Sequence, residues 1–154
     1  MGPGVRRDDV AGFEPMDARD FISVGMSAER TLVVPPERTV RHFLAHMPAV
    51  YATPMMILEM EMASGDAIAH TLPQGWVTVG TEVNVRHLAA CGVGATVRTT
   101  SRVIAVERRV IRFEVAAFDG ERRIGDGHHA RGLINVAKFE KLFGQVGPHI
   151  PPSS

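Results

Sequence analysis

A hydroxyl, a carboxylate and an imidazole stand at positions in this chain from which they could be aimed into one cleft. Thr53 opens the one strongly helical stretch, Glu61 lies eight residues further along it, and His87 closes an alternating apolar run. Hydrolysis of an activated acyl group requires these group types, because it needs a nucleophile or base, a proton shuttle and a group that positions them. The trio therefore indicates an enzyme.

Each member of this trio also has a purely structural interpretation. Thr53 precedes Pro54 and is a preferred helix N-cap, although a hydroxyl there would also lie beside free amides and the positive end of the helix dipole. Glu61 competes with Glu59, which lies about 160° away around the helix. Only one of the two can face inward, and the pattern alone does not choose. His87 shares its strand face with alternating valines, which favours an inward side chain.

Other polar residues give weaker signals. His128 and His129 are adjacent and point to opposite faces of a strand, and no i, i+2 or i, i+4 pair of ligands accompanies them. Cys91 is the single cysteine, so the chain lacks the Cys-x-x-Cys spacing of a zinc site. We therefore predict no metal. Gly80 lies in mid-strand, where glycine is unfavourable unless the backbone must approach another group closely or the strand is bulged.

The elements that would position these groups follow a simple order. Apolar residues at helical spacing predict a long helix after Thr53, and the pattern then changes to a period of two, which predicts strands. Asp119 and Gly120 are a strong signal for a two-residue hairpin turn. We predict strands at residues 27–34, 76–87, 96–107, 110–118 and 122–136, a helix at 54–69 and a short terminal helix at 138–143.

A helix followed by a meander of strands lacks the βαβ alternation of a parallel sheet. The predicted class is therefore α+β, with an antiparallel sheet wrapped around a single long helix. Such a sheet leaves an edge and an apolar face open, and a symmetric homodimer would cover them.

Composition narrows the setting of the protein. The chain has 154 residues, which suits one domain, and 17 basic residues balance 17 acidic ones, so no overall field favours nucleic acid or an anionic membrane. No run approaches the roughly 18 apolar residues of a membrane span. One cysteine and no visible secretory signal favour the cytoplasm. We predict a flexible leader at residues 1–20, the folded domain at 21–143 and a flexible tail at 144–154.

Several motifs together resemble the hotdog-fold thioesterases of the fluoroacetyl-CoA thioesterase type. They are VYATPMM at residues 50–56 with Glu61 after it, VGT at 79–81, VRH at 85–87 and GHHAR at 127–131. The resemblance implies a hotdog fold, a dimer with its sites at the subunit interface, and a catalytic set of Thr53, Glu61 and His87. It also implies that Gly80 lies near the substrate carbonyl and that Arg131 is an active-site arginine, and it favours Glu61 over Glu59.

The resemblance further implies an acyl-CoA substrate, with coenzyme A as part of that substrate and no separate cofactor. One segment departs from the family, because residues 43–50 are shorter than the part that carries gating phenylalanines in the fluoroacetyl-specific enzyme. Leu44 and Met47 fall near the corresponding places, and we expect Met47 to contact a small acyl group. The alternative is a non-catalytic acyl-CoA-binding hotdog dimer. A dehydratase would place its histidine and acid differently.

Overall fold

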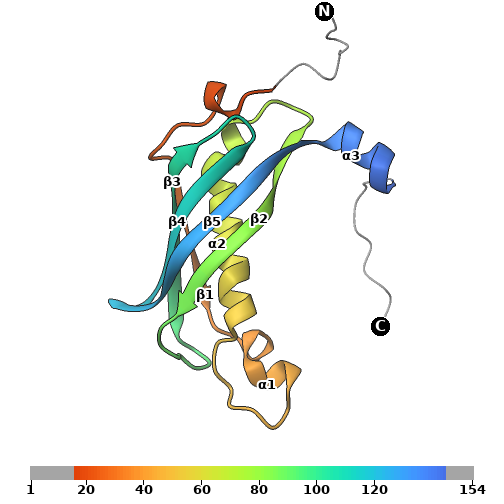
Figure 1. Ribbon diagram of the computed structural model, residues 1–154. Helices are drawn as coiled ribbons and strands as arrows, with labels where there is room; N and C mark the ends of the chain where they lie inside the picture. The colour runs from red at the N-terminus through yellow and green to blue at the C-terminus, as the bar shows by residue number, and fades with distance from the viewer. Residues whose placement is uncertain (1–15, 145–154) are drawn as a thin grey trace, which may run out of the picture.

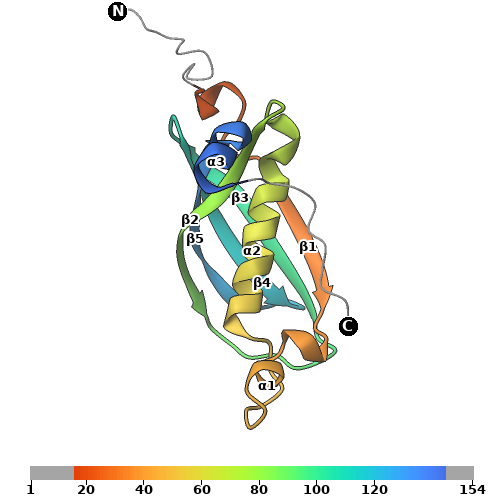
Figure 2. The same cartoon turned by 90° about the vertical axis from the view of Figure 1, so that its right-hand side faces the viewer.

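One long apolar helix forms the axis of the fold. The computed structural model describes residues 16–144, in which α2 spans Thr53–Ile68. Met56, Met60, Ala63 and Ala67 recur at helical spacing, and each is at most 2% exposed. This stripe packs against the sheet. Figure 2 shows α2 lying against one face of the sheet, with the strands curled around the helix.

The sheet has five antiparallel strands in the order β1-β3-β4-β5-β2. Strands β3, β4 and β5 form a meander, while β1 and β2 add to its two edges (Figure 1). The apolar side chains of the sheet's inner face, such as Phe113 and Val103, are fully buried in the core. The strands are β1 Ser27–Val33, β2 Trp76–His87, β3 Thr96–Val106, β4 Val110–Asp119 and β5 Arg122–Asn135.

Shorter helical pieces flank these elements. They are η1 Ala18–Asp20, η2 Pro36–Arg38, α1 Val40–Phe43, η3 Ala69–Thr71 and α3 Val136–Phe143. The order of elements and the antiparallel pairing confirm the predicted α+β class. Within residues 16–144, no helix is long and apolar enough to cross a bilayer.

The hairpin turn between β4 and β5 lies one residue later than predicted. The β4–β5 turn consists of Gly120 and Glu121 rather than Asp119 and Gly120, because Asp119 still pairs with Arg122 across the hairpin. Gly120 has a φ of 63°, and no other residue type in the described chain has a positive φ. A single glycine at the first turn position is the pattern of a type II′ hairpin.

The packed part of the chain extends beyond the predicted start at residue 21. Ala18 is fully buried and belongs to the hydrophobic core with Ile22. The Ala18 amide also donates to the carbonyl of Arg108 at 2.8 Å, which ties this segment to the turn before β4. The rest of the predicted leader, residues 1–15, and the tail from residue 145 lie outside the described residues.

Strand β2 forms an open edge of the sheet. Val77, Val79 and Val83 on this strand are 41%, 39% and 44% exposed, although valine is normally a core residue. The strand is also bulged, because the register with β5 shifts between Gly80 and Glu82. An exposed edge with this composition is a site for pairing with another strand.

Candidate active site

Thr53 and His87 form the first polar group of the site. Thr53 is the first residue of α2, His87 is the last residue of β2, and Thr53 Oγ1 lies 2.7 Å from His87 Nδ1. Ala52 is the N-cap, so the predicted cap role of Thr53 is wrong. The Thr53 hydroxyl instead forms a hydrogen bond with the imidazole of His87. The pair opens onto a surface depression that is also lined by Val40, Val50, Leu88 and Ala89.

The environment of His87 keeps its ring neutral at pH 7. Burial lowers the pKa of His87, and the nearby backbone of Ala89 opposes this only in part. Its Nε2 atom is buried and has no hydrogen-bond partner among the described residues. A buried ring nitrogen without a partner is costly, so such an atom calls for an explanation, and proton transfer to a bound substrate is one.

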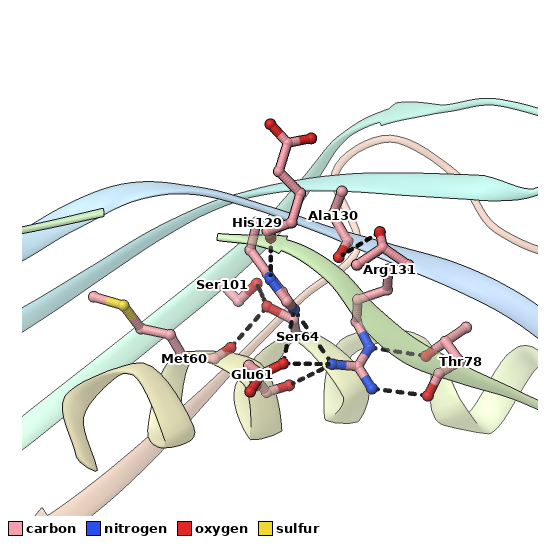
Figure 3. Close-up of polar contacts among 10 residues, drawn as sticks. Met60, Glu61, Ser64, Thr78, Ser101, His129, Ala130 and Arg131 are labelled. Atoms are coloured by element: carbon pink, nitrogen blue, oxygen red, sulfur yellow. Dashed lines mark hydrogen bonds and ion pairs between the residues drawn. The ribbon is translucent and has the colours of Figure 1, made fainter. Parts of the chain in front are cut away.

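Glu61 lies at the centre of a second polar group. It projects from the middle of α2 toward β2 and β5, and its side chain is 35% exposed. Oε2 lies 3.9 Å from His129 Nε2 and 4.0 Å from Arg131 Nη1 (Figure 3). Gly80 faces the carboxylate so closely that a Cβ at this position would overlap Oε2. The mid-strand glycine therefore makes room for a carboxylate.

Arg131 is a built-in part of this second group. Its Nε donates to Thr78 Oγ1 at 2.9 Å, and its Nη2 donates to the Thr78 carbonyl at 2.8 Å. Only 13% of the Arg131 side chain is exposed, and burial lowers its pKa from the usual very high value. A guanidinium nevertheless remains charged, so Arg131 places a fixed positive charge beside Glu61.

Glu59 has a structural role, which distinguishes it from Glu61. Its side chain is only 4% exposed, with Oε1 3.1 Å from Arg30 Nε and Oε2 3.3 Å from Arg38 Nη1. These contacts tie α2 to β1 and to η2. Of the two carboxylates that the sequence pattern left open, Glu59 is therefore committed to ion pairs, while Glu61 faces the partly exposed site.

The two polar groups are separate within the single chain. Eight residues along an α-helix correspond to a rise of about 12 Å between Thr53 and Glu61. The structure therefore pairs Thr53 with His87 and places Glu61 with Gly80 and Arg131. Met47 is not among the residues that line the depression at Thr53; its carbonyl instead accepts from Arg41 Nε at 2.7 Å.

His129 and Thr78 are parts of the site that the sequence did not assign to it. His129 stands two residues before Arg131 on β5, so strand periodicity puts both on one face, and this spacing could have revealed the pair. The partnership of Thr78 with Arg131 depends on the register of β2 against β5 and leaves no sequence signal. Residues 16–144 contain no group of three His, Cys, Asp or Glu side chains that could hold a metal.

The architecture defines the class of protein. A hot-dog-like protein from Thermanaerovibrio acidaminovorans superposes with a TM-score of 0.77, covering 87% of this chain and 100% of that one at 24% identity. A curved antiparallel sheet around one central helix, together with this likeness, identifies the hotdog fold.

Closer relatives place the chain within that class. The model of the fluoroacetyl-CoA-specific thioesterase family matches residues 34–137. The fluoroacetyl-CoA thioesterase of Streptantibioticus cattleyicolor is 38% identical over 136 residues, which cover 84% of this chain and 98% of that protein. The solved fluoroacetyl-CoA thioesterase FlK, also 38% identical, superposes with a TM-score of 0.76 over 82% of this chain and 98% of that one. A variant of FlK has been solved with fluoroacetate and CoA.

The chain belongs to the fluoroacetyl-CoA-specific thioesterase family, and it is a thioester hydrolase. The family and enzyme class expected from the motifs are thereby confirmed.

Proposed function

We propose that this enzyme hydrolyses the thioester bond of an acyl-CoA with a small acyl group, using Thr53, Glu61 and His87. The observation that carries the proposal is the 2.7 Å contact between Thr53 and His87 at the start of α2, beside a ring nitrogen that has no partner. The relation to a fluoroacetyl-CoA thioesterase and the variant of FlK that binds CoA support the substrate class.

Glu61 supplies the carboxylate that the reaction needs. It either attacks the thioester carbon to give a mixed anhydride or removes a proton from the attacking water. Both routes require a carboxylate with free oxygens, and within residues 16–144 neither oxygen of Glu61 accepts a hydrogen bond. Nη1 of Arg131 lies 4.0 Å from Oε2, so a positive charge stands beside the carboxylate without occupying its oxygens.

The oxyanion and the leaving group require different kinds of catalysis. Backbone amides at the start of α2 and at Gly80 would stabilise negative charge that develops on the carbonyl oxygen. A thiol has a pKa of about 8.5, so the thiolate of CoA departs without strong acid catalysis. In the anhydride route, neutral His87 removes a proton from the water that releases the acid and passes it to this thiolate. In the general-base route, it relays to the thiolate the proton that Glu61 has taken from the water. Thr53 holds the His87 ring in position.

A homodimer would unite the two polar groups. They lie about 12 Å apart along one helix, whereas the open edge of β2 carries three exposed valines next to Gly80. Pairing of two such edges about a two-fold axis would cover the valines and set Glu61 of one protomer opposite His87 of the partner subunit. Two identical sites then form, as an isologous interface requires.

The segment before α2 determines which acyl groups the enzyme accepts. Phe43 and Leu44 in this segment are 57% and 51% exposed, so their side chains do not close over Thr53 in the single chain. We propose that Met47 and its neighbours contact the acyl group in the dimer, and we assign only a small acyl group rather than fluoroacetyl. A reducing compartment such as the cytoplasm fits the single buried Cys91.

A panel of acyl-CoAs with detection of the released thiol tests the proposal. We expect turnover of short acyl chains, with losses of at least about a hundredfold in Glu61→Ala and His87→Ala. The matched controls Glu121→Ala and His70→Ala change exposed residues of the same types and keep the wild-type rate. Full rate in either site variant would overturn the residue assignment. Binding of acyl-CoA by calorimetry without any turnover would instead favour the non-catalytic dimer.

A further inference from the structure

His129 is a buried imidazole next to the Glu61 carboxylate, and the proposed reaction gives it no role. It lies on β5 with only 2% of its side chain exposed, and its Nε2 is 3.9 Å from Glu61 Oε2. Figure 3 shows the ring directed from the sheet toward α2, between Glu61 and the arginine. A Cβ built on Gly80 would lie 3.1 Å from His129 Cε1, so the same glycine makes room for the ring.

Two hydrogen bonds fix the protonation state of this ring. His129 Nδ1 lies 2.8 Å from the carbonyl oxygen of Glu82, and a carbonyl only accepts, so Nδ1 carries the proton. His129 Nε2 lies 3.3 Å from Arg131 Nη1, and a guanidinium only donates, so Nε2 offers its lone pair. One form alone satisfies both partners, namely the neutral ring protonated on Nδ1.

The surroundings of the ring also favour the neutral form. Burial lowers the pKa of His129, and the positive charge of Arg131 lowers it further. The hydrogen bond to Glu82 and the negative charge of Glu61 act in the opposite direction but do not reverse the shift. His129 therefore acts toward Arg131 as a hydrogen-bond acceptor at neutral pH.

Arg131 Nη1 is the guanidinium nitrogen that matters for Glu61. The other two nitrogens are engaged with Thr78, while Nη1 donates to His129 Nε2 and, at 3.4 Å, to the backbone carbonyl of Glu61. It thus lies 4.0 Å from Oε2 without donating to it. A small movement of the arginine would replace this arrangement by a direct pair that occupies a carboxylate oxygen.

We propose that His129 is a positioning residue that keeps the Glu61 carboxylate free to react. By accepting from Nη1, His129 holds the arginine at a distance where its charge acts on Glu61 but its hydrogen bonds do not occupy the carboxylate. The inference rests on the proposed function of Glu61. It predicts that the acceptor atom of residue 129, rather than the ring as such, determines the rate.

Two substitutions separate the acceptor from the donor. In His129→Gln the amide oxygen can take the place of Nε2, whereas in His129→Asn the shorter amide can reach only the Glu82 carbonyl. We expect kcat with a short-chain acyl-CoA to fall about 10–100-fold in His129→Asn, from the loss of one acceptor for a buried charged donor. His129→Gln should stay within about fivefold of wild type, and KM should change little in both.

His128→Asn is the matched control, because it makes the same change at the adjacent exposed residue and should leave kcat unchanged. A wild-type kcat in His129→Asn, or an equal loss in His129→Gln and His129→Asn, would overturn the inference. Thermal unfolding of every variant identifies a loss of activity that comes from unfolding.

Nitrogen-15 NMR of the wild-type imidazoles tests the same inference without turnover. The expected result is an Nδ1–H tautomer for His129 with a pKa below that of an ordinary histidine, which is about 6.5. A ring protonated on Nε2, or one that titrates like an ordinary histidine, would refute it. A wild-type enzyme without hydrolytic activity would overturn the proposed function instead, and the NMR result would still decide the state of His129.

Discussion

Gly80→Ala is the substitution for which the structure makes the sharpest prediction. The added methyl group would overlap Glu61 Oε2 and would lie 3.3 Å from Glu61 Cδ. Backbone strain does not enter, because Gly80 is not among the glycines with a positive φ. The flexible end of Glu61 gives way more easily than the buried His129 ring or the strand, so the main consequence is a displaced carboxylate.

The size of the effect follows from that displacement. Oε2 must move by more than about 1 Å to reach an ordinary contact distance, and a misplacement of about 1 Å can already cost about 100-fold in rate. This corresponds to about 2.7 kcal/mol of transition-state stabilisation. Stability should change little, since Gly→Ala at a compatible position gains about 0.4–1 kcal/mol from the unfolded chain, which offsets the crowding.

The assay compares kcat/KM for a short acyl-CoA with the midpoint of thermal unfolding. We expect an activity loss of about 100-fold with a Tm within about 4 °C of wild type. Gly92→Ala is the matched control, because its added Cβ would meet only the Ala49 carbonyl at an ordinary 3.8 Å. Wild-type activity in Gly80→Ala would show that the reaction does not depend on this position of the Glu61 carboxylate.

Three further predictions concern the remaining polar groups. Burial lowers the pKa of both His87 and His129 below 6.5, so the unfolded chain takes up protons first as the pH falls. The contribution of these histidines to the free energy of unfolding should therefore be fully present above a pH of about 6.5 and decline below it. The acid limb of the kcat/KM profile should have its midpoint below 6.5. A midpoint at 7 would contradict the role of His87. Thr53→Val should lower kcat/KM about 10–100-fold, because it leaves His87 Nδ1 without its partner, whereas Thr53→Ser should retain most of the rate; equal losses would show that the hydroxyl is not what matters. Glu59→Gln should lower the free energy of unfolding in urea by about 2 kcal/mol. This is less than the loss of a fully buried ion pair, because both arginine partners are partly exposed. The control Asp66→Asn, at an exposed residue, should lower it by less than about 0.5 kcal/mol. Equal losses would contradict the structural role of Glu59.

Most of the fold could be predicted because local patterns and tertiary packing agree. The valine alternation ending at His87 coincides with β2 over its whole length, and the apolar stripe of α2 is the stripe that is buried. The sequence pattern does not distinguish element boundaries that differ by one residue. Thr53 and Ala52 are both compatible with the start of a helix, and the choice is made by the hydrogen bond between Thr53 and His87.

The site was less predictable because it depends on register and on side chains far apart in the chain. The sequence alone could not separate Glu59 from Glu61, since their difference lies in Arg30 and Arg38, which reach Glu59 from β1 and η2. The sequence pattern offers His129 only as a metal ligand. Its place beside Glu61 follows from the pairing of β2 with β5, which brings Gly80 opposite Arg131.

The central claim is that Glu61 of one protomer acts with Thr53 and His87 of its partner. Mixing Glu61→Gln and His87→Ala subunits tests it most directly, because each mixed dimer would contain one site with both substitutions and one site with neither. Random exchange gives mixed dimers in half of the population, and one of the two sites in each is intact. We therefore expect about a quarter of the wild-type activity to be recovered from two inactive parents. Mixtures that stay as inactive as the parents would contradict it.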